Sequence, residues 1–249
     1  MKTVLITGAS SGYGLETARH FHAEGWNVIA TMRTPRRNVL PESPRMQVVA
    51  LDVTNAASIA AALAECRSID VLVNNAGIGL FGASEATPMA TIREVFETNT
   101  FGVMAMTQAV LPAFRERGSG VIVNVTSSAV LLPMPLVAPY TASKMAIEGY
   151  TASLALELEA FAIRVKLVQP GYGPTTRFAS NSGHRLEGLV TAPYAALAQR
   201  MFAALADMPA VTRESDVAEA VWQAANDSGG RLRYPAGADA VALAALSAS

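Results

Sequence analysis

The stretch TGASSGYG, residues 7–14, ends the first apolar run of the chain, KTVLIT at residues 2–7. Its glycines stand at positions 8, 12 and 14. Glycines at a strand-to-helix turn let backbone amides approach a phosphate group, which then lies at the positive end of the helix. The Lys-Ser/Thr ending of nucleotide-hydrolase loops is absent, and the spacing differs from the common G-x-G-x-x-G pattern. The turn therefore indicates nucleotide binding in an α/β fold, with a tightly packed structural turn as the alternative.

Apolar runs alternate with helical stretches along the rest of the chain. After the first strand, we expect strands at residues 26–32, 46–51, 69–74, 120–126, 163–169 and 231–235. Runs that are apolar throughout are typical of a sheet covered on both faces. Alternation of strands and helices predicts parallel pairing with right-handed crossovers, a doubly wound α/β fold in one domain over residues 1–249. The region at about 172–212 follows the sixth strand, so we expect it to cover the ligand-binding edge of the sheet.

Composition excludes several classes of function. The net charge of −1 gives no basic excess for a nucleic acid. The single cysteine, Cys66, rules out an intramolecular disulfide and is expected to be a packing residue, and His20, His22 and His184 form no metal-ligand set with it. The chain has neither a secretory signal pattern near Met1 nor an apolar run of about 18 residues. We therefore expect no metal, no membrane span and a cytoplasmic location.

Four motifs occur in a fixed order: TGASSGYG, NNAG at 74–77, a serine at 127 and YTASK at 140–144. Together they resemble the classical short-chain dehydrogenase/reductase family, over residues 3–175. The resemblance implies a Rossmann-type fold with a seven-stranded, mostly parallel sheet and helices on both faces. It also implies a nicotinamide cofactor and the interconversion of a carbonyl and an alcohol.

Tyr140 and Lys144 have the spacing of a proton donor and a cation that tunes it. Carbonyl reduction needs a hydride and a proton for the developing alkoxide, and a tyrosine with a pKa of about 10 is a poor partner at neutral pH. A nearby cation lowers that pKa. The two residues are one helical turn apart, so we expect Lys144 to lower the pKa of Tyr140. The resemblance implies that Lys144 also binds the nicotinamide ribose; a solvated surface helix is the simpler alternative.

Two further residues complete the expected catalytic set. The resemblance assigns Ser127 to holding the substrate oxygen, and the usual interval to Tyr140 favours it over Thr126 and Ser128. Asn99, in ETNTFG, matches the family asparagine that kinks a helix and anchors a proton-relaying water. A turn serine and a solvated or capping asparagine are the alternatives.

The resemblance places the cofactor along the ends of several strands. Asp52 is expected at the adenine with the backbone of Val53, whereas Asn74 is expected to tie strands together. Thr175 is expected at the nicotinamide carboxamide, but Gly173 stands where valine is common, which leaves Thr176 open. The full expected set is Gly8, Ser10, Ser11, Gly12, Tyr13, Gly14, Arg33, Asp52, Val53, Asn75, Ala76, Gly77, Tyr140, Lys144, Pro170, Gly171 and Thr175.

The end of the second strand decides between the two nicotinamide cofactors. An acidic residue there would bind a ribose 2′-hydroxyl and repel a 2′-phosphate, but Thr31 holds that position and Arg33 follows, with Arg36 and Arg37 close behind. Arginine binds phosphate with two hydrogen bonds. The sequence predicts NADP(H), with NAD(H) as the alternative, although Ser11 stands where the family has its other basic residue.

The expected substrate site is mostly apolar, which favours a hydrophobic or aromatic carbonyl. We expect contacts from Ser127, Leu132, Met134, Tyr140 and Tyr172. Further lining residues are expected at Phe81, Leu131, Val137, Phe178, Leu186 and Leu189. Arg177, His184 and Arg185 would recognise an anion, but a solvated role is expected for them.

Residues 101–111 contain no charged side chain and residues 145–156 contain only Glu148. A surface helix needs a polar face, so we expect these helices to pair between subunits of a homodimer or homotetramer.

Competing functions are an NAD(H)-dependent alcohol dehydrogenase, a nucleotide-binding regulator without turnover, and an epimerase or dehydratase of the wider fold. Retention of Asn99, Ser127, Tyr140 and Lys144 argues against a regulator.

Overall fold

The computed structural model describes residues 1–66, 68–176 and 188–247. Five residues considered for the substrate site lie outside these ranges: Arg177, Phe178, His184, Arg185 and Leu186. The side chain of Arg37 also lies outside the description.

Seven strands form one sheet in the order β3-β2-β1-β4-β5-β6-β7, and every neighbouring pair is parallel. The predicted doubly wound sheet is confirmed, and its described pairs are all parallel rather than mostly so. The strands are β1 (Thr3–Ile6), β2 (Asn27–Met32), β3 (Met46–Ala50), β4 (Val71–Asn74), β5 (Gly120–Val125), β6 (Ile163–Pro170) and β7 (Arg233–Ala236). The strand order reverses between β1 and β4, where open α/β sheets have their ligand crevice.

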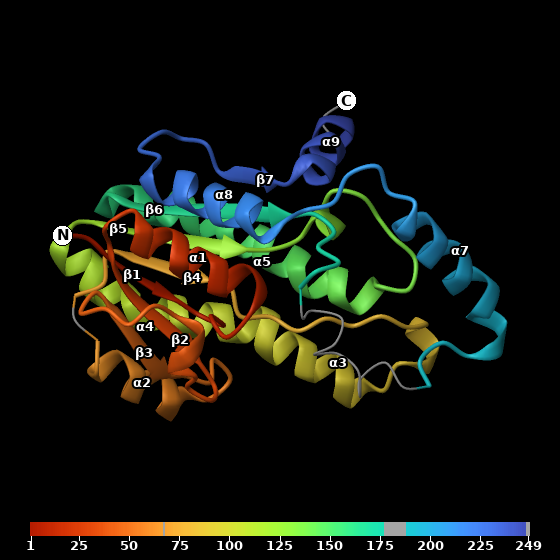
Figure 1. The fold of residues 1–249 in the computed structure, drawn as a ribbon, viewed down its shortest axis with the longest axis horizontal. Helices are drawn as coiled ribbons and strands as arrows, with labels where there is room; N and C mark the ends of the chain where they lie inside the picture. Colours follow the sequence, from red (N-terminus) through yellow and green to blue (C-terminus); the bar gives the residue numbers. More distant parts are fainter. Residues whose placement is uncertain (67, 177–187, 248–249) are drawn as a thin grey trace.

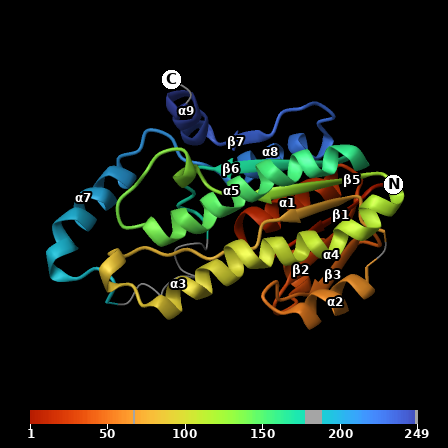
Figure 2. The ribbon, with the colours of Figure 1, turned by 180° about the vertical axis from the view of Figure 1, so that it is seen from behind.

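Helices cover both faces of the sheet (Figures 1 and 2). On one face, α1 (Gly12–Ala23) packs beside α8 (Glu214–Asn226), and Phe21 lies edge-on to Trp222 with 5.0 Å between ring centroids. On the other face lie α2 (Ala56–Ala64), α4 (Gly102–Arg117) and α5 (Ala138–Leu158). The apolar strands are thus buried on both sides, which explains their unbroken hydrophobic pattern.

A long broken helix runs along one face. It consists of α3 (Met89–Phe96), a π-helical turn over Glu97–Phe101, and α4. Such turns insert an extra residue into the helix and occur often at functional sites. The expected kink around Asn99 is this π-helical turn.

Two helices complete the described chain. α7 (Ala195–Ala206) lies beyond the carboxyl ends of the strands, and α9 (Ala238–Ser247) lies next to β7 (Figure 1). Within the described residues, none of the helices combines the length and apolar character needed to cross a membrane.

Candidate active site

The glycine turn between β1 and α1 lies directly against the segment after β4. Gly8 has a φ of +71°, and a Cβ atom added to it would lie 2.8 Å from the Cα of Ala76. A Cβ on Gly14 would lie 2.3 Å from the Nδ2 of Asn75. Both positions therefore exclude any side chain, because real Cβ atoms essentially never approach so closely.

Hydrogen bonds join these two segments. The Thr7 hydroxyl accepts from the backbone N–H groups of Asn75 and Ala76, each at 3.0 Å. The Asn75 side chain donates to the carbonyls of Thr7 at 2.9 Å and Gly8 at 3.2 Å. Thr7 was not among the expected site residues, and its buried hydroxyl fixes the distance between the turn and the NNAG segment.

The first turn of α1 is open to a ligand. Ser11 is the N-cap residue, and its hydroxyl makes no capping hydrogen bond within the described part of the chain. The first N–H groups of a helix need a partner, and an anion at this end also interacts favourably with the helix dipole. The turn therefore suits a pyrophosphate.

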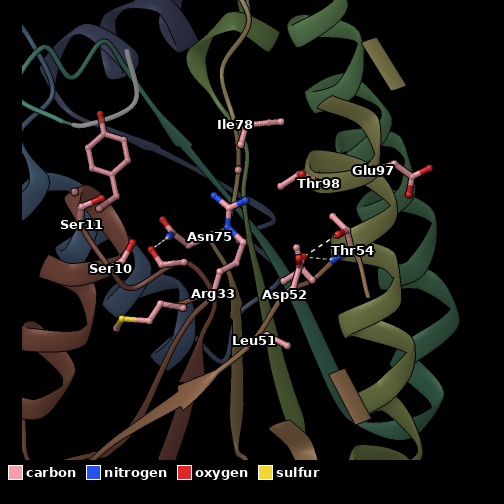
Figure 3. Close-up of a pocket in the computed structure, with 18 of the residues that line it drawn as sticks. Ser10, Ser11, Arg33, Leu51, Asp52, Thr54, Asn75, Ile78, Glu97 and Thr98 are labelled. Carbon is pink, nitrogen blue, oxygen red and sulfur yellow. Dashed lines mark hydrogen bonds between the residues drawn. The ribbon is translucent and has the colours of Figure 1, made fainter. Parts of the chain in front are cut away.

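A cavity of about 600 Å³ opens at this turn (Figure 3). Twelve of the expected cofactor residues line it: Gly8, Ser10, Ser11, Gly12, Tyr13, Gly14, Arg33, Asp52, Val53, Asn75, Ala76 and Gly77. Eight further residues line it as well: Met32, Leu51, Thr54, Ile78, Glu94, Glu97, Thr98 and Thr176. Five of these lie next to the expected cofactor residues; Glu94 belongs to α3, and Glu97 and Thr98 belong to the π-helical turn that carries Asn99. The volume, the side-chain-free glycines and the open helix end fit a dinucleotide.

Arginines meet the cavity at the end of β2. Arg33 projects into it near Asp52 (Figure 3), and Arg36 donates from Nη2 to the Ser10 carbonyl at 2.7 Å. Thr31 does not face the cavity: it is fully buried and its hydroxyl donates to the Ile6 carbonyl at 3.0 Å. The strand end therefore presents Met32 and Arg33, which corrects the expectation that Thr31 occupies the ribose-facing position.

Asp52 is held as a carboxylate. Its Oδ1 accepts from the Thr54 backbone at 3.0 Å and from the Thr54 hydroxyl at 2.8 Å. These hydrogen bonds, the backbone one first, and the charge of Arg33 lower the pKa of Asp52 below its ordinary value despite partial burial. The cavity wall thus carries both a negatively charged hydrogen-bond acceptor, Asp52, and a positively charged donor, Arg33.

Tyr140 is buried, and its side chain makes a hydrogen bond with the side chain of Ser127. Burial raises the pKa of Tyr140 to about 12, while a hydrogen bond with the Ser127 side chain acts in the opposite direction. The neighbouring Thr126 hydroxyl instead donates to Glu148 at 2.9 Å. The structure therefore directs Ser127, and not Thr126, toward the tyrosine.

Lys144 is almost fully buried, and its ammonium donates to the Val125 carbonyl at 3.0 Å. Burial lowers the pKa of Lys144 to about 8. Burial raises the pKa of Tyr140 more than the Ser127 hydrogen bond lowers it, and the lowering of that pKa by Lys144 stays a prediction. Tyr140 is accordingly a protonated donor at neutral pH.

Asn99 joins the π-helical turn to the other motifs. It accepts from the Ile78 N–H at 2.8 Å, donates to the Ile78 carbonyl at 2.9 Å and donates to the Ser143 hydroxyl at 3.1 Å. A Cβ on Gly77 would lie 3.3 Å from Asn99 Oδ1 and 3.4 Å from Lys144 Nζ. Asn99 and Lys144 therefore approach the same point of the backbone.

The segment after β6 meets the cavity through Thr176. Thr175 is exposed and its hydroxyl lies 3.0 Å from both oxygens of Glu214, whereas Thr176 lines the cavity. This geometry favours Thr176, the alternative that the sequence left open. Pro170 and Gly171 do not line the cavity, and a Cβ on Gly171 would lie 2.1 Å from the Asp239 carboxylate.

An apolar shell surrounds Tyr140 on the side away from the glycine turn. Ala129, Val137 and Leu189 are buried with Leu80 and Val95, and Ile78, Phe81, Met134 and Met201 pack against them. Leu132 and Tyr172, expected to touch the substrate, have exposed fractions of 48% and 37%. Within the described residues, His, Cys, Asp and Glu form no cluster that could hold a metal ion.

Comparison with known proteins shows the family of this chain. The family model described as short chain dehydrogenase matches residues 2–186. The chain belongs to this family. A short-chain dehydrogenase from Streptomyces avermitilis superposes with a TM-score of 0.82 at 34% identity, covering 98% of this chain and 90% of that one.

Two further proteins are similar to this chain. The closed form of a serine dehydrogenase complexed with NADP+ superposes with a TM-score of 0.77 at 31% identity, over 93% of each chain. A 3-ketodihydrosphingosine reductase from Bacteroides thetaiotaomicron is 41% identical over 172 residues, 68% of this chain and 62% of the reductase. The match thus spans less than two thirds of that reductase.

Proposed function

We propose that the protein is an NADP(H)-dependent carbonyl reductase that also runs in reverse as an alcohol dehydrogenase. The observation that carries this proposal is the protonated Tyr140 beside Ser127, in an apolar shell next to a cavity built around a glycine turn. A bound nicotinamide supplies or accepts the hydride. In the reductive direction Ser127 holds the carbonyl oxygen, and Tyr140 donates the proton that the developing alkoxide needs.

Lys144 and Asn99 have supporting roles in this proposal. Lys144, with its pKa lowered to about 8, is mainly protonated at neutral pH and lies one helical turn from Tyr140. Its charge would help to hold the nicotinamide cofactor, with the ribose as the group that the ammonium would bind. The Asn99 side chain is fixed by Ile78 and Ser143, so it holds the π-helical turn beside Lys144.

The cofactor preference follows from the arginines at the end of β2. Arg33 faces the cavity and Arg36 is held at Ser10, so two guanidinium groups lie where a 2′-phosphate would extend. Ser11 stands at the position where the family has a second basic residue. Arg36, which binds the carbonyl of the neighbouring Ser10, places a positive charge beside that position. The NADP+ complex of the related serine dehydrogenase supports this preference.

The substrate class follows from the shell around Tyr140. That shell offers apolar side chains such as Phe81, Met134 and Leu189, which favours a ketone or aldehyde with an apolar body. The similarity to a 3-ketodihydrosphingosine reductase supports a ketone substrate. The region at 172–212 would act as its cover, with α7 as the described helical part.

The experiment that tests the proposal is a panel of hydrophobic ketones, aldehydes and alcohols with NADPH, NADH, NADP+ and NAD+. Oxidation of NADPH by apolar carbonyls, faster than that of NADH, is the expected result. Tight cofactor binding without turnover across the panel would support a nucleotide-binding regulator instead. Preferential use of NAD+ with alcohols would support the NAD-dependent dehydrogenase.

The proposal includes assembly through α4 and α5. The side chains of Phe101, Met145 and Leu156 have exposed fractions of 52%, 49% and 72% in the isolated chain. Such exposed apolar groups along two neighbouring helices favour a two-fold interface. Light scattering at micromolar concentration should report a dimer or tetramer, and Met145→Glu should weaken it; a monomeric wild-type protein would contradict this.

A further inference from the structure

Tyr13 reaches from the glycine turn to the segment that follows β6. Its ring is half-buried and lines the cofactor cavity, and its hydroxyl donates to the Gly171 carbonyl at 3.5 Å. Burial and the nearby carboxylates of Glu214 and Asp239 raise the pKa of Tyr13, so the hydroxyl remains protonated. Tyr13 is thus a neutral group between the cavity and this segment.

Gly173 leaves the space that the Tyr13 hydroxyl occupies. A Cβ on Gly173 would lie 2.1 Å from the Tyr13 oxygen, 2.9 Å from its Cζ and 3.1 Å from the Thr176 Cγ2. No side chain fits there while the phenol keeps its place. Gly173 is also the position at which the sequence departs from the valine common in the family, and Tyr13 explains that departure sterically.

Thr176 links this contact to the cavity. Its hydroxyl donates to the Gly173 carbonyl at 2.8 Å, and its backbone N–H donates to the same carbonyl at 3.2 Å. A Cβ on Gly12 would lie 3.5 Å from the Thr176 Cβ, so Thr176 faces the glycine turn as well. A shift of Gly173 would therefore move Thr176 on the cavity wall.

We propose that Tyr13 and Gly173 form a matched pair that sets the position of residues 171–176 over the cofactor cavity. Tyr13 is a positioning residue in this pair, acting through Gly173 and Thr176. The inference rests on the proposed function, because it assigns the pair an effect on cofactor binding.

The outer side of the same segment has separate anchors. The Tyr172 N–H donates to Asp239 at 2.7 Å, and the Thr175 hydroxyl lies against Glu214. These contacts keep the segment attached when the pair is disturbed. A substitution in the pair therefore shifts the inner side of the segment, toward or away from the cavity, without releasing it.

The test is a double-mutant cycle with Gly173→Val, Tyr13→Leu and the combined variant. Overpacking costs about 1–3 kcal/mol, so Gly173→Val should raise the NADPH dissociation constant about tenfold or more. Tyr13→Leu alone should change it by less than about threefold, because the hydroxyl contact is long. In the combined variant, leucine leaves room for valine, and binding should return to within about threefold of Tyr13→Leu.

Two further variants keep the cycle interpretable. Gly173→Ala adds only the Cβ that would meet the Tyr13 oxygen, so it should weaken NADPH binding even if the valine variant does not fold. Gly230→Ala is the matched control, since nothing lies within 4 Å of its added Cβ. Melting temperatures and a kcat and KM pair for one ketone are recorded for every folded variant.

The outcomes separate the pair from the proposed function. Rescue of NADPH binding by the second substitution would support the pair. Normal NADPH binding by both Gly173 variants, or a combined variant as impaired as Gly173→Val, would overturn the inference while wild-type binding and turnover still support the proposed function. A wild-type protein that binds neither reduced cofactor would overturn the proposed function and this inference with it.

Discussion

The cofactor cavity and the substrate side of the cleft are built in different ways. Gly8, Gly14 and the hydrogen bonds of Asn75 hold the cavity wall through backbone contacts that tolerate no side chain. The substrate side is an apolar shell, in which Phe81 of the loop after β4 lies 4.8 Å, ring to ring, from Phe202 of α7. The cavity wall therefore needs particular residues at fixed positions, whereas the apolar shell needs only side chains that are apolar and fill the space.

This difference explains why the sequence reveals the reaction class better than the substrate. The reaction class depends on the glycine turn and the proposed proton donor, whereas the carbonyl compound would bind against a shell that supplies only apolar contacts. The following substitutions test that contrast, beginning with the one expected to cause the largest loss of turnover, the removal of the Tyr140 hydroxyl.

Tyr140→Phe removes the proposed proton donor and leaves the ring in place. General acid catalysis contributes about 10²–10⁴-fold, so turnover should fall by that factor while NADPH binding stays within about twofold. Initial rates and a fluorescence titration of NADPH measure the two quantities. Tyr150→Phe on the same helix is the matched control and should keep its turnover; equal losses in both variants would contradict the assignment.

Gly14→Ala places a methyl group 2.3 Å from the Asn75 Nδ2 and 2.5 Å from the Gly8 carbonyl oxygen. Overpacking of about 1–3 kcal/mol should weaken binding of both nicotinamide cofactors roughly 10- to 100-fold. The control Gly230→Ala should leave binding unchanged. A Gly14→Ala protein with normal affinity would show that the turn does not form the phosphate site.

Arg33→Asp exchanges the cavity cation for a carboxylate. A hydrogen bond to a charged group contributes about 1.5–3 kcal/mol, so NADPH affinity should fall about tenfold or more while NADH affinity is retained. Dissociation constants for both cofactors provide the measurement. Arg115→Asp, far from the cavity, makes the same charge change; an equal loss for NADPH and NADH in Arg33→Asp would argue against a phosphate contact.

Lys144→Met tests the buried ammonium through the pH dependence of stability. The pKa of Lys144 is lowered from 10.5 to about 8 by burial, so between these values the unfolded chain binds more protons and wild-type stability rises with pH. The variant lacks this contribution. The difference in melting temperature, wild type minus variant, should therefore grow by a few degrees from about pH 8 to pH 10.

Lys2→Met, at an exposed position, provides the reference for that pH series. Its melting temperature should stay at a constant offset from the wild type. A constant offset for Lys144→Met as well would show that the ammonium group is not buried in solution.

The strands and the main motifs were predictable because each depends on local sequence. Both-face burial produces unbroken apolar runs, and the close approach of Gly8 to Ala76 requires glycine. Thr31 was wrongly expected to face the ribose. Successive side chains of a strand point to opposite faces, and only the pairing of β2 with β1 shows that the Thr31 hydroxyl binds the Ile6 carbonyl. The sequence cannot supply that register by itself.

Other features required the three-dimensional arrangement. The π-helical turn places Glu97 and Thr98 on the cavity wall, whereas the sequence marked only Asn99 of this turn as a site residue. Lys144 was expected to tune Tyr140 from spacing alone, yet its ammonium is directed at the Val125 carbonyl. The pairing of Tyr13 with Gly173 joins residues far apart in the chain, so it is visible only in the fold.

In the proposed function, Tyr140 and a nicotinamide cofactor act together on a carbonyl group. The most direct test is the reduction of an apolar ketone with NADPH that is deuterated at C4 of the nicotinamide, followed by mass spectrometry of the alcohol. One deuterium at the carbinol carbon with the wild-type protein, and almost none with Tyr140→Phe, is the predicted result. NADPH binding without deuterium in any product of the carbonyl panel, or equal transfer by both proteins, would contradict the claim.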